Sequence, residues 1–503
     1  MRNAHAVADI RAAEQALMAR VPPGALMQRA AAGLAAVCAG LVPRVYGSRV
    51  VVLAGSGDNG GDALYAGARL AQRGARVVAV AAGTRVHEEG AAALRAAGGR
   101  VTVPGDPGLP ATIDAADLVL DGLLGIGGRG GLREPQAALA ALAEAARTAT
   151  GTRVVAVDLP SGVDGDTGEV TGAAVRADVT VTFGTWKAGL LIDPGAGRAG
   201  LAQLVDIGLA PCLPAPAAVA YGARDVGALL PVPGRESDKY RRGVLGVVAG
   251  SDRFTGAAAL AVGGALRGGA GLVRLVSAEA AVAVVRQHWP EAVITVTGET
   301  GEEIGAAGRV QAWLAGPGMG TDERAHRRLA AVLATDLPVL VDADGLTLVA
   351  DSPALVEQRR APTLLTPHAG ELARLMRADP AEITARRAEH ARAAARTFGC
   401  CVLLKGSTTV IAAADDSPLL VNPTGTGWLA TGGTGDVLAG LAGALLAQGL
   451  AVREAAAAAA FLHGISARYA AGGGDPVPGG EAPIGAGDVI DALPDAIRGV
   501  REA

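Results

Sequence analysis

Apolar strand-like runs that alternate with helical segments restrict this chain to an α/β fold. Residues 49–54 are apolar after Arg49 and lead into a glycine turn, a helix is expected from near Asp62 to Gln72, and residues 76–80 form the next run. Two strands joined through a helix in this way are parallel. The same pattern predicts further strands at 118–121, 154–158, 244–249, 312–315, 339–341, 363–365 and 400–404.

The 503 residues exceed what one hydrophobic core normally supports, so more than one domain is expected. The segment from Ile207 to Tyr221 contains three prolines and little periodicity, which predicts a domain boundary there. We therefore expect a Rossmann-like three-layer α/β domain over residues 1–215 and a second α/β domain over residues 222–503.

Charge and cysteine content limit the partners and the compartment. The net charge is only −4, from 45 basic and 49 acidic residues, which gives no reason to expect nucleic acid or an anionic membrane as a partner. The four cysteines show no metal-ligand spacing, the first residues form no hydrophobic signal segment, and no apolar stretch is long enough to predict a membrane span. We expect a reduced, cytoplasmic protein that acts on small molecules and forms a homo-oligomer.

The first glycine loop has the G-x-G-x-x-G spacing of a dinucleotide-binding turn, with Gly55, Gly57 and Gly60. A hydride-transferring Rossmann enzyme would need an acidic residue at the end of the following strand to hold the ribose, and residues 80–83 provide none. Asp58 and Asp62 would also lie close to a pyrophosphate. The sequence therefore disfavours a dehydrogenase.

Polar side chains follow three of the predicted strands in this half. Asn59 and Asp62 follow the first, Asp121 lies at the end of the second, and Asp158 and Ser161 follow the third. Each could be a helix cap or turn former. Taken together they favour a site at the carboxyl edge of the sheet, where oxygen ligands suit a hard cation or the hydroxyl groups of a ligand.

These segments resemble the three motifs of the NAD(P)H-hydrate epimerase family: residues 58–62, 121–127 and 157–162, in family order between Ala13 and about Ile207. The resemblance implies a potassium ion held by Asn59, Asp121 and Ser161. It also implies substrate contacts from Asp58, Asn59, Gly60, Gly61, Asp62, Gly125, Ile126, Gly127, Gly128, Arg129, Gly130, Gly131 and Asp158. The family usually has asparagine in place of Asp58, which adds a charge near the ligand here, and glycine in place of Ala63.

A second glycine loop, Gly432-Gly433-Thr434-Gly435-Asp436, precedes an apolar helix. Glycines at a helix start leave backbone N–H groups accessible to a phosphate, and an aspartate there can accept a proton from a hydroxyl nucleophile. A helix cap after a flexible turn would explain Asp436 but not the glycines and threonines before it. The chain has no Walker A motif.

Two further segments follow strands in this half. Lys405, one of only three lysines, begins the segment 405–409 and could neutralise phosphate charge or be a solvated turn residue. His368 lies in the segment 366–371, where a single histidine is more often structural than catalytic.

Together with residues 239–243, 249–257, 316–318 and 341–344, these segments resemble the ribokinase-like NAD(P)H-hydrate dehydratase family over about Val232 to Leu493. The resemblance implies a ribokinase-like α/β fold and substrate contacts from Ala257, Gly318, His368 and Asp436. It implies nucleotide contacts from Lys405, Gly406, Ser407, Thr408, Thr409 and Gly435. The two families in this order resemble bifunctional bacterial NAD(P)H-hydrate repair enzymes.

The resemblance implies two activities on the hydrated cofactors NADHX and NADPHX. One interconverts their R and S forms with K⁺ bound, and the other dehydrates the S form at the expense of ADP with Mg²⁺, releasing AMP and phosphate. We expect Asp436 to be the catalytic base of dehydration and Asp158 to serve epimerisation. The alternatives are a small-molecule kinase of the same fold and a non-catalytic nucleotide sensor, which an intact Asp436 disfavours.

Overall fold

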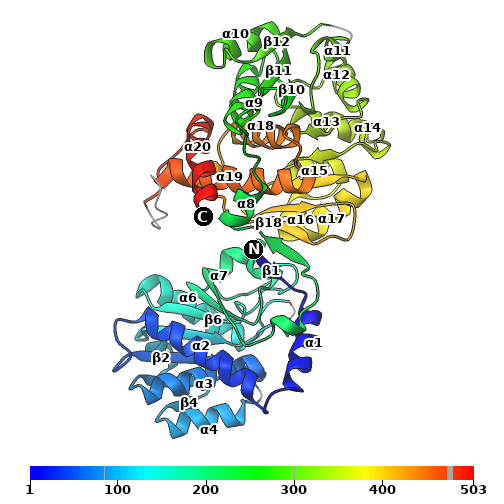
Figure 1. Cartoon of the computed structure of the whole chain (residues 1–503). Helices are drawn as coiled ribbons and strands as arrows, with labels where there is room; N and C mark the ends of the chain where they lie inside the picture. Colours follow the sequence, from blue (N-terminus) through cyan, green and yellow to red (C-terminus); the bar gives the residue numbers. More distant parts are fainter. Residues whose placement is uncertain (84, 129, 299–300, 473–479) are drawn as a thin grey trace. The chain divides into compact units, whose positions relative to one another are not determined.

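The computed structural model describes residues 1–83, 85–128, 130–298, 301–472 and 480–503. The chain forms two compact units, which are Asn3–Ala218 and Val219–Ala503 with Met1–Arg2 (Figure 1). Within the described ranges no helix has the length and apolar character needed to cross a membrane. The predicted α/β class is confirmed in both units.

The first unit is built on a seven-stranded parallel sheet with helices on both faces. In spatial order its strands are β4 (Arg100–Thr102), β3 (Arg76–Ala81), β2 (Arg49–Ala54), β5 (Leu118–Gly122), β6 (Arg153–Val157), β7 (Val179–Phe183) and β8 (Leu201–Val205). Along β2, Val50 and Val52 join one buried cluster and Val51 and Leu53 the other, because successive strand side chains point to opposite faces. The first cluster includes α1 (Val7–Met18), α2 (Ala25–Leu41), α3 (Asp58–Gln72) and α4 (Glu88–Ala96), and the second α5 (Leu109–Asp114) and α6 (Gln136–Ala149).

Helix α3 begins at Asp58, four residues before its predicted start. Gly57 has an extended backbone and acts as the N-cap, and a carboxylate in the first turn interacts favourably with the helix dipole. The loop before α3 is therefore short and tightly packed: a Cβ on Gly55 would lie 1.9 Å from the Leu123 carbonyl oxygen. As a result Asp58 and Asp62 stand one helical turn apart on the same face of α3.

The second unit holds most of an eleven-stranded sheet, nine of whose strands lie wholly within its bounds. In spatial order its strands are β1 (Arg2–Ala4), β9 (Ala218–Ala220), β18 (Leu419–Asn422), β17 (Thr409–Ala412), β16 (Cys401–Leu404), β15 (Thr363–Leu365), β14 (Val339–Val341), β13 (Ala312–Ala315), β10 (Val244–Val248), β11 (Leu272–Ser277) and β12 (Val293–Val296). The strands from β16 to β12 are parallel to their neighbours, whereas β17 pairs antiparallel with both β16 and β18. The parallel strands share one carboxyl edge, where a ligand site is expected.

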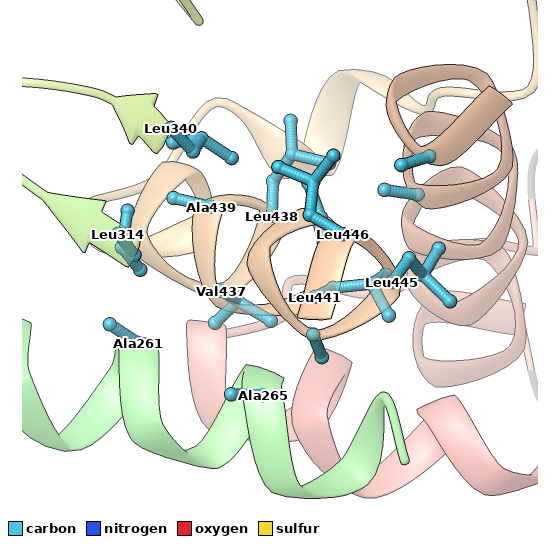
Figure 2. Close-up of a cluster of buried hydrophobic side chains, with 14 of the residues drawn as sticks. Ala261, Ala265, Leu314, Leu340, Val437, Leu438, Ala439, Leu441, Leu445 and Leu446 are labelled. Carbon is cyan, nitrogen blue, oxygen red and sulfur yellow. The ribbon is translucent and has the colours of Figure 1, made fainter. Parts of the chain in front are cut away.

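Helix α18 (Thr434–Ala447) lies in the core of this unit (Figure 2). Every residue from Val437 to Ala447 is buried, and a helix that is apolar on all sides needs packing partners all round. Ala261 and Ala265 of α9 (Thr255–Arg267) pack below it in Figure 2, and Leu314 of β13 and Leu340 of β14 approach from the sheet. The core thus holds the glycine loop at the start of α18 on a rigid support.

Candidate active sites

In the first unit, Asp121 and Ser161 meet at the carboxyl ends of β5 and β6. Ser161 Oγ donates to Asp121 Oδ1 at 2.6 Å, and the Ser161 backbone N–H donates to Oδ2 at 2.8 Å. The Asp121 carboxyl is fully buried, and burial raises its pKa to about 6 although these hydrogen bonds lower it. No cation contacts this carboxyl within the described part of the chain.

Asn59, the third residue of the predicted potassium site, lies beside the loop that leaves β5. A Cβ on Gly125 would be 2.9 Å from Asn59 Oδ1, so the glycine allows a close approach. Asn59 Nδ2 is buried and has no hydrogen-bond partner among the described residues. Among the described residues, the Asn59 amide nitrogen therefore has no hydrogen-bond partner and the Asp121 carboxylate has no ion-pair partner.

Asp158 is held by a buried lysine that sequence analysis assigned no role. The Lys187 side chain is 1% exposed and forms an ion pair with Asp158 Oδ1, and its Nζ also donates to Thr182 Oγ1 at 2.9 Å and to the Phe183 carbonyl oxygen at 3.0 Å. Asp158 itself has a left-handed backbone, with φ of 68°. The scarcity of lysine in the chain is the one sequence signal that could have drawn attention to Lys187.

A cavity of about 630 Å³ opens at this edge and is lined by carboxylates. The predicted residues that line it are Asp58, Asn59, Asp62, Gly125, Ile126, Gly127, Gly128 and Asp158. Glu14 of α1 also lines it and was missed, because its sequence setting is an ordinary amphipathic helix. Burial raises the pKa of Glu14, and the charge of Asp158 adds to that effect.

The other predicted epimerase residues lie elsewhere. Gly60 and Gly61 are buried within α3 and do not line the cavity, and a Cβ on Gly60 would be 2.2 Å from the Gly55 carbonyl oxygen. Gly131 packs against Gly172, Gly130 is exposed, and neither lines the cavity. Arg129 lies outside the described residues.

In the second unit, Asp436 stands in the first turn of α18. Gly433, the N-cap, has a φ of 90°, a conformation that favours glycine. Burial and, after it, the charge of Asp342 raise the pKa of Asp436 to about 7, although the charge of Lys405 lowers it. A carboxyl with this pKa can act as a general base near neutral pH.

Lys405 lies among carboxylates next to the glycine loop. Its Nζ donates to Asp342 Oδ1 at 2.7 Å and is 3.6 Å from Glu371 Oε2, and a Cβ on Gly435 would be 3.6 Å from the same Nζ. Burial lowers the pKa of Lys405, but Asp342 and Glu371 outweigh it and leave a net rise. Lys405 is therefore a fixed cation beside the loop and not a solvated turn residue.

His368 caps helix α15 (Ala369–Met376). Its Nδ1 accepts from the backbone N–H groups of Gly370 at 3.0 Å and Glu371 at 3.2 Å, while Glu371 Oε2 accepts from the His368 N–H at 2.8 Å. Since Nδ1 is an acceptor, the neutral ring carries its proton on Nε2, on a side chain that is 59% exposed. His368 thus caps α15 through Nδ1 and leaves an exposed side chain at the same edge of the sheet.

The other predicted dehydratase residues follow neighbouring parallel strands. Ala257 lies in the first turn of α9 after β10, and Gly318 follows β13; a Cβ on Gly318 would be 2.8 Å from the Ala257 Cβ. Gly406 and Ser407 are exposed between β16 and β17, whereas Thr408 and Thr409 are buried at the start of β17. The fold brings these segments to the edge that carries Asp436.

A buried histidine beneath the glycine loop was not predicted from the sequence. His463 of α19 (Val452–Gly472) lies with Nε2 2.9 Å from the Thr434 carbonyl oxygen. A carbonyl oxygen can only accept, so Nε2 carries the proton, and burial lowers the pKa of His463 to about 4. The neutral ring therefore fixes the first residue of α18.

Comparison with known proteins assigns both units to families. Residues 245–473 match the family model described as NAD(P)H-hydrate dehydratase, and residues 23–189 match the one described as YjeF-related protein N-terminus. The bifunctional NAD(P)H-hydrate repair enzyme Nnr of Mycobacterium leprae is 47% identical over 502 residues, which cover 99% of both chains. The enzyme of that name from Mycobacterium tuberculosis H37Rv is 48% identical over 462 residues, covering 91% of this chain and 92% of the relative.

Solved structures are similar to the second unit. A ribokinase-like superfamily protein of Enterococcus faecalis is 22% identical and covers 57% of this chain and 98% of its own, with a TM-score of 0.51, which confirms the ribokinase-like fold. An ADP/ATP-dependent NAD(P)H-hydrate dehydratase of Bacillus subtilis, co-crystallised with ATP and Mg²⁺, is 31% identical over 55% of this chain and 96% of its own, with a TM-score of 0.49. Because relatives of that name are 47% identical over 99% of this chain and 48% identical over 91% of it, the chain belongs to the family of bifunctional NAD(P)H-hydrate repair enzymes.

Proposed function

We propose that this chain repairs NADH and NADPH that have been hydrated on the nicotinamide ring. The first unit interconverts the R and S hydrates, and the second unit dehydrates the S form with ADP, releasing AMP and phosphate. The observation that carries the proposal is Asp436, a carboxyl with a pKa of about 7 in the first turn of α18 beside the fixed cation Lys405. The names of the full-length relatives support the same pair of activities.

Dehydration needs activation because hydroxide is a poor leaving group. Asp436 accepts the proton of the ring hydroxyl while the hydroxyl oxygen attacks the terminal phosphorus of ADP. The bond from that phosphorus to the AMP oxygen breaks at the same time. Backbone N–H groups of Gly433 to Gly435 receive the charge on the transferring group. Phosphate then leaves the ring carbon with the help of the nitrogen lone pair, and loss of a proton from the adjacent carbon restores the reduced ring.

The two metal ions would be held in different ways. The described residues contain no group of three or more His, Cys, Asp or Glu side chains that could hold a metal, so Mg²⁺ would arrive on the nucleotide phosphates, whose charge it neutralises. Potassium suits the oxygen atoms of Asn59, Asp121 and Ser161. The buried charge of Asp121, which no described cation contacts, is the observation that supports a monovalent ion there.

Product analysis tests the proposal against its main alternative, a small-molecule kinase. A mixture of both NADHX epimers is incubated with the full chain, ADP and Mg²⁺ in potassium buffer. We expect NADH, AMP and free phosphate in equal amounts. A stable phosphorylated ring product would contradict the proposal and favour a kinase.

The dehydration step is expected to accelerate with rising pH. Asp436 must be ionised to accept a proton, and with a pKa of about 7 its ionised fraction grows about tenfold between pH 6 and pH 8. The rate with purified S epimer and saturating ADP should therefore rise about tenfold over that interval and then level off. A flat profile in single-turnover measurements would contradict the assignment of Asp436 as the base.

Asp158→Ala is expected to stop repair part way. The ring carbon that bears the hydroxyl also neighbours nitrogen, so the hydroxyl can depart and return, and Asp158 is the charged group that the fold fixes in the cavity. With both epimers and ADP, we expect a normal first phase as S is consumed and a second phase slowed about a hundredfold, monitored by NADH absorbance. Complete recovery at the wild-type rate would remove Asp158 from the mechanism.

A further inference from the structure

We propose that Asp62 is the catalytic residue that carries the proton in epimerisation, and that Lys187 is a positioning residue that fixes Asp158 as its charged partner. This inference rests on the epimerase activity proposed above and names the two roles within its site. The proton is thus carried by Asp62 and not by Asp158, the carboxylate that Lys187 holds.

The contacts of Asp158 leave one oxygen atom available to a ligand. Lys187 Nζ, Thr182 Oγ1 and the Phe183 N–H all donate to Oδ1, the last two at 3.2 Å. The described residues provide no hydrogen bond to Oδ2, and Asp158 lines the 630 Å³ cavity. A carboxyl group anchored through one oxygen to a buried lysine presents its other oxygen in a fixed direction.

The environment of Asp62 differs from that of Asp158, because no lysine pairs with Asp62 among the described residues. It lines the same cavity and an adjoining one of about 280 Å³, and its Oδ1 is buried without a hydrogen-bond partner among the described residues. The ionisable groups that line these two cavities with Asp62 are Arg11, Glu14, Asp58, Tyr65, His87, Glu89 and Asp158, and Lys187 lies behind Asp158.

The neighbours of Asp62 favour its neutral form. Burial raises its pKa well above the usual value, the charges of Asp158, Asp58 and Glu14 raise it further, and Lys187 opposes them. One cavity therefore holds a lysine-paired carboxylate and a carboxylic acid with an unpaired oxygen. When the surroundings of two carboxyl groups favour the ionised form of one and the neutral form of the other, the neutral one can donate a proton and the ionised one can stabilise positive charge.

The chemistry balances with these groups alone. The Asp62 proton moves to the hydroxyl oxygen on the ring carbon, the carbon–oxygen bond breaks, and the ring nitrogen lone pair forms a C=N bond as water departs. The Asp158 carboxylate offsets the positive charge that results on the ring. Water then adds to the opposite face, the C=N bond returns its electron pair to nitrogen, and a proton returns to Asp62.

The first test uses Asp62→Asn in the full chain, with the exposed Glu88→Gln as a charge-matched control on α4. Purified R epimer is incubated without ADP, and formation of the S epimer is followed by chromatography. We expect Asp62→Asn to slow interconversion about a hundredfold or more and Glu88→Gln to leave it unchanged. Interconversion by Asp62→Asn at the wild-type rate overturns the inference, whereas no interconversion by the wild type contradicts the proposed epimerase itself.

A second variant, Asp58→Asn, tests the proton assignment without removing Asp62. The protonated acid is the active form, so the rate should fall as pH rises through the pKa of Asp62. Because the charge of Asp58 raises that pKa, Asp58→Asn should move the decline to lower pH. A merely structural role for Asp62 predicts no such shift, so a decline that stays in place or moves to higher pH overturns the inference.

Discussion

Asp436→Asn is expected to lower the rate of ADP-dependent dehydration by about 10²- to 10⁴-fold while leaving epimerisation at the wild-type rate. The amide keeps the shape of the side chain but cannot accept the hydroxyl proton. With ADP present, the variant should form NADH from the S epimer only at this reduced rate, whereas it should still interconvert R and S. Absorbance of NADH measures the first activity and chromatography of the epimers the second.

The exposed Asp491→Asn, on α20 (Ala486–Glu502) of the same unit, is the matched control and should retain both activities. Asp436 is only half-buried in the first turn of α18, so we expect both variants to melt within a few degrees of the wild type. Dehydration by Asp436→Asn near the wild-type rate would mean that another group accepts the proton.

Lys187→Met is expected to destabilise the first unit by about 3–5 kcal/mol, because it leaves the Asp158 carboxylate buried without its cation. For a unit of this size the melting temperature should fall by about 10 °C. Chemical denaturation measures the loss directly, since the midpoint should decrease without a change in slope.

Two comparisons separate this effect from the loss of any lysine. Lys239→Met removes an exposed lysine and should change stability by less than about 0.5 kcal/mol. Adding Asp158→Asn to Lys187→Met removes the unpaired charge and should restore part of the stability, and asparagine tolerates the left-handed backbone at position 158. A double variant no more stable than Lys187→Met would show that the ion pair is not the source of the effect.

The periodic apolar runs were sufficient to predict an α/β fold, because parallel strands buried on both faces have nearly continuous apolar sequences. They did not predict β17 and β18, the two strands of the antiparallel part of the second sheet. The start of α3 was also misplaced. Gly60 and Gly61 suggested a loop, but both lie inside α3. They are glycines because the Gly55 backbone, in the case of Gly60, and the His87 and Met27 side chains, in the case of Gly61, leave no room for a Cβ.

The positions of Asp121 and Ser161 at the carboxyl edge of the sheet could be predicted because they follow strands in short motifs, and that of Asp436 because its glycine loop precedes an apolar helix. Lys187, Glu14 and His463 were not, because each reaches its site through tertiary packing. Lys187 lies 29 residues after its partner in the sequence, and His463 reaches the glycine loop from the helix after α18. Sequence spacing carries no information about such contacts.

The start of the chain has a practical consequence for separating the two activities. Strand β1 occupies the end of the eleven-stranded sheet beside β9, and the Met1 amino group lies 2.6 Å from Asp225 Oδ2. A fragment that begins at Ala218, the first residue of β9, would lack β1 and expose a row of unpaired backbone N–H and C=O groups, on which a second molecule can pair. An isolated dehydratase fragment should therefore aggregate unless the opening residues are grafted back or the new edge is blocked with proline or lysine.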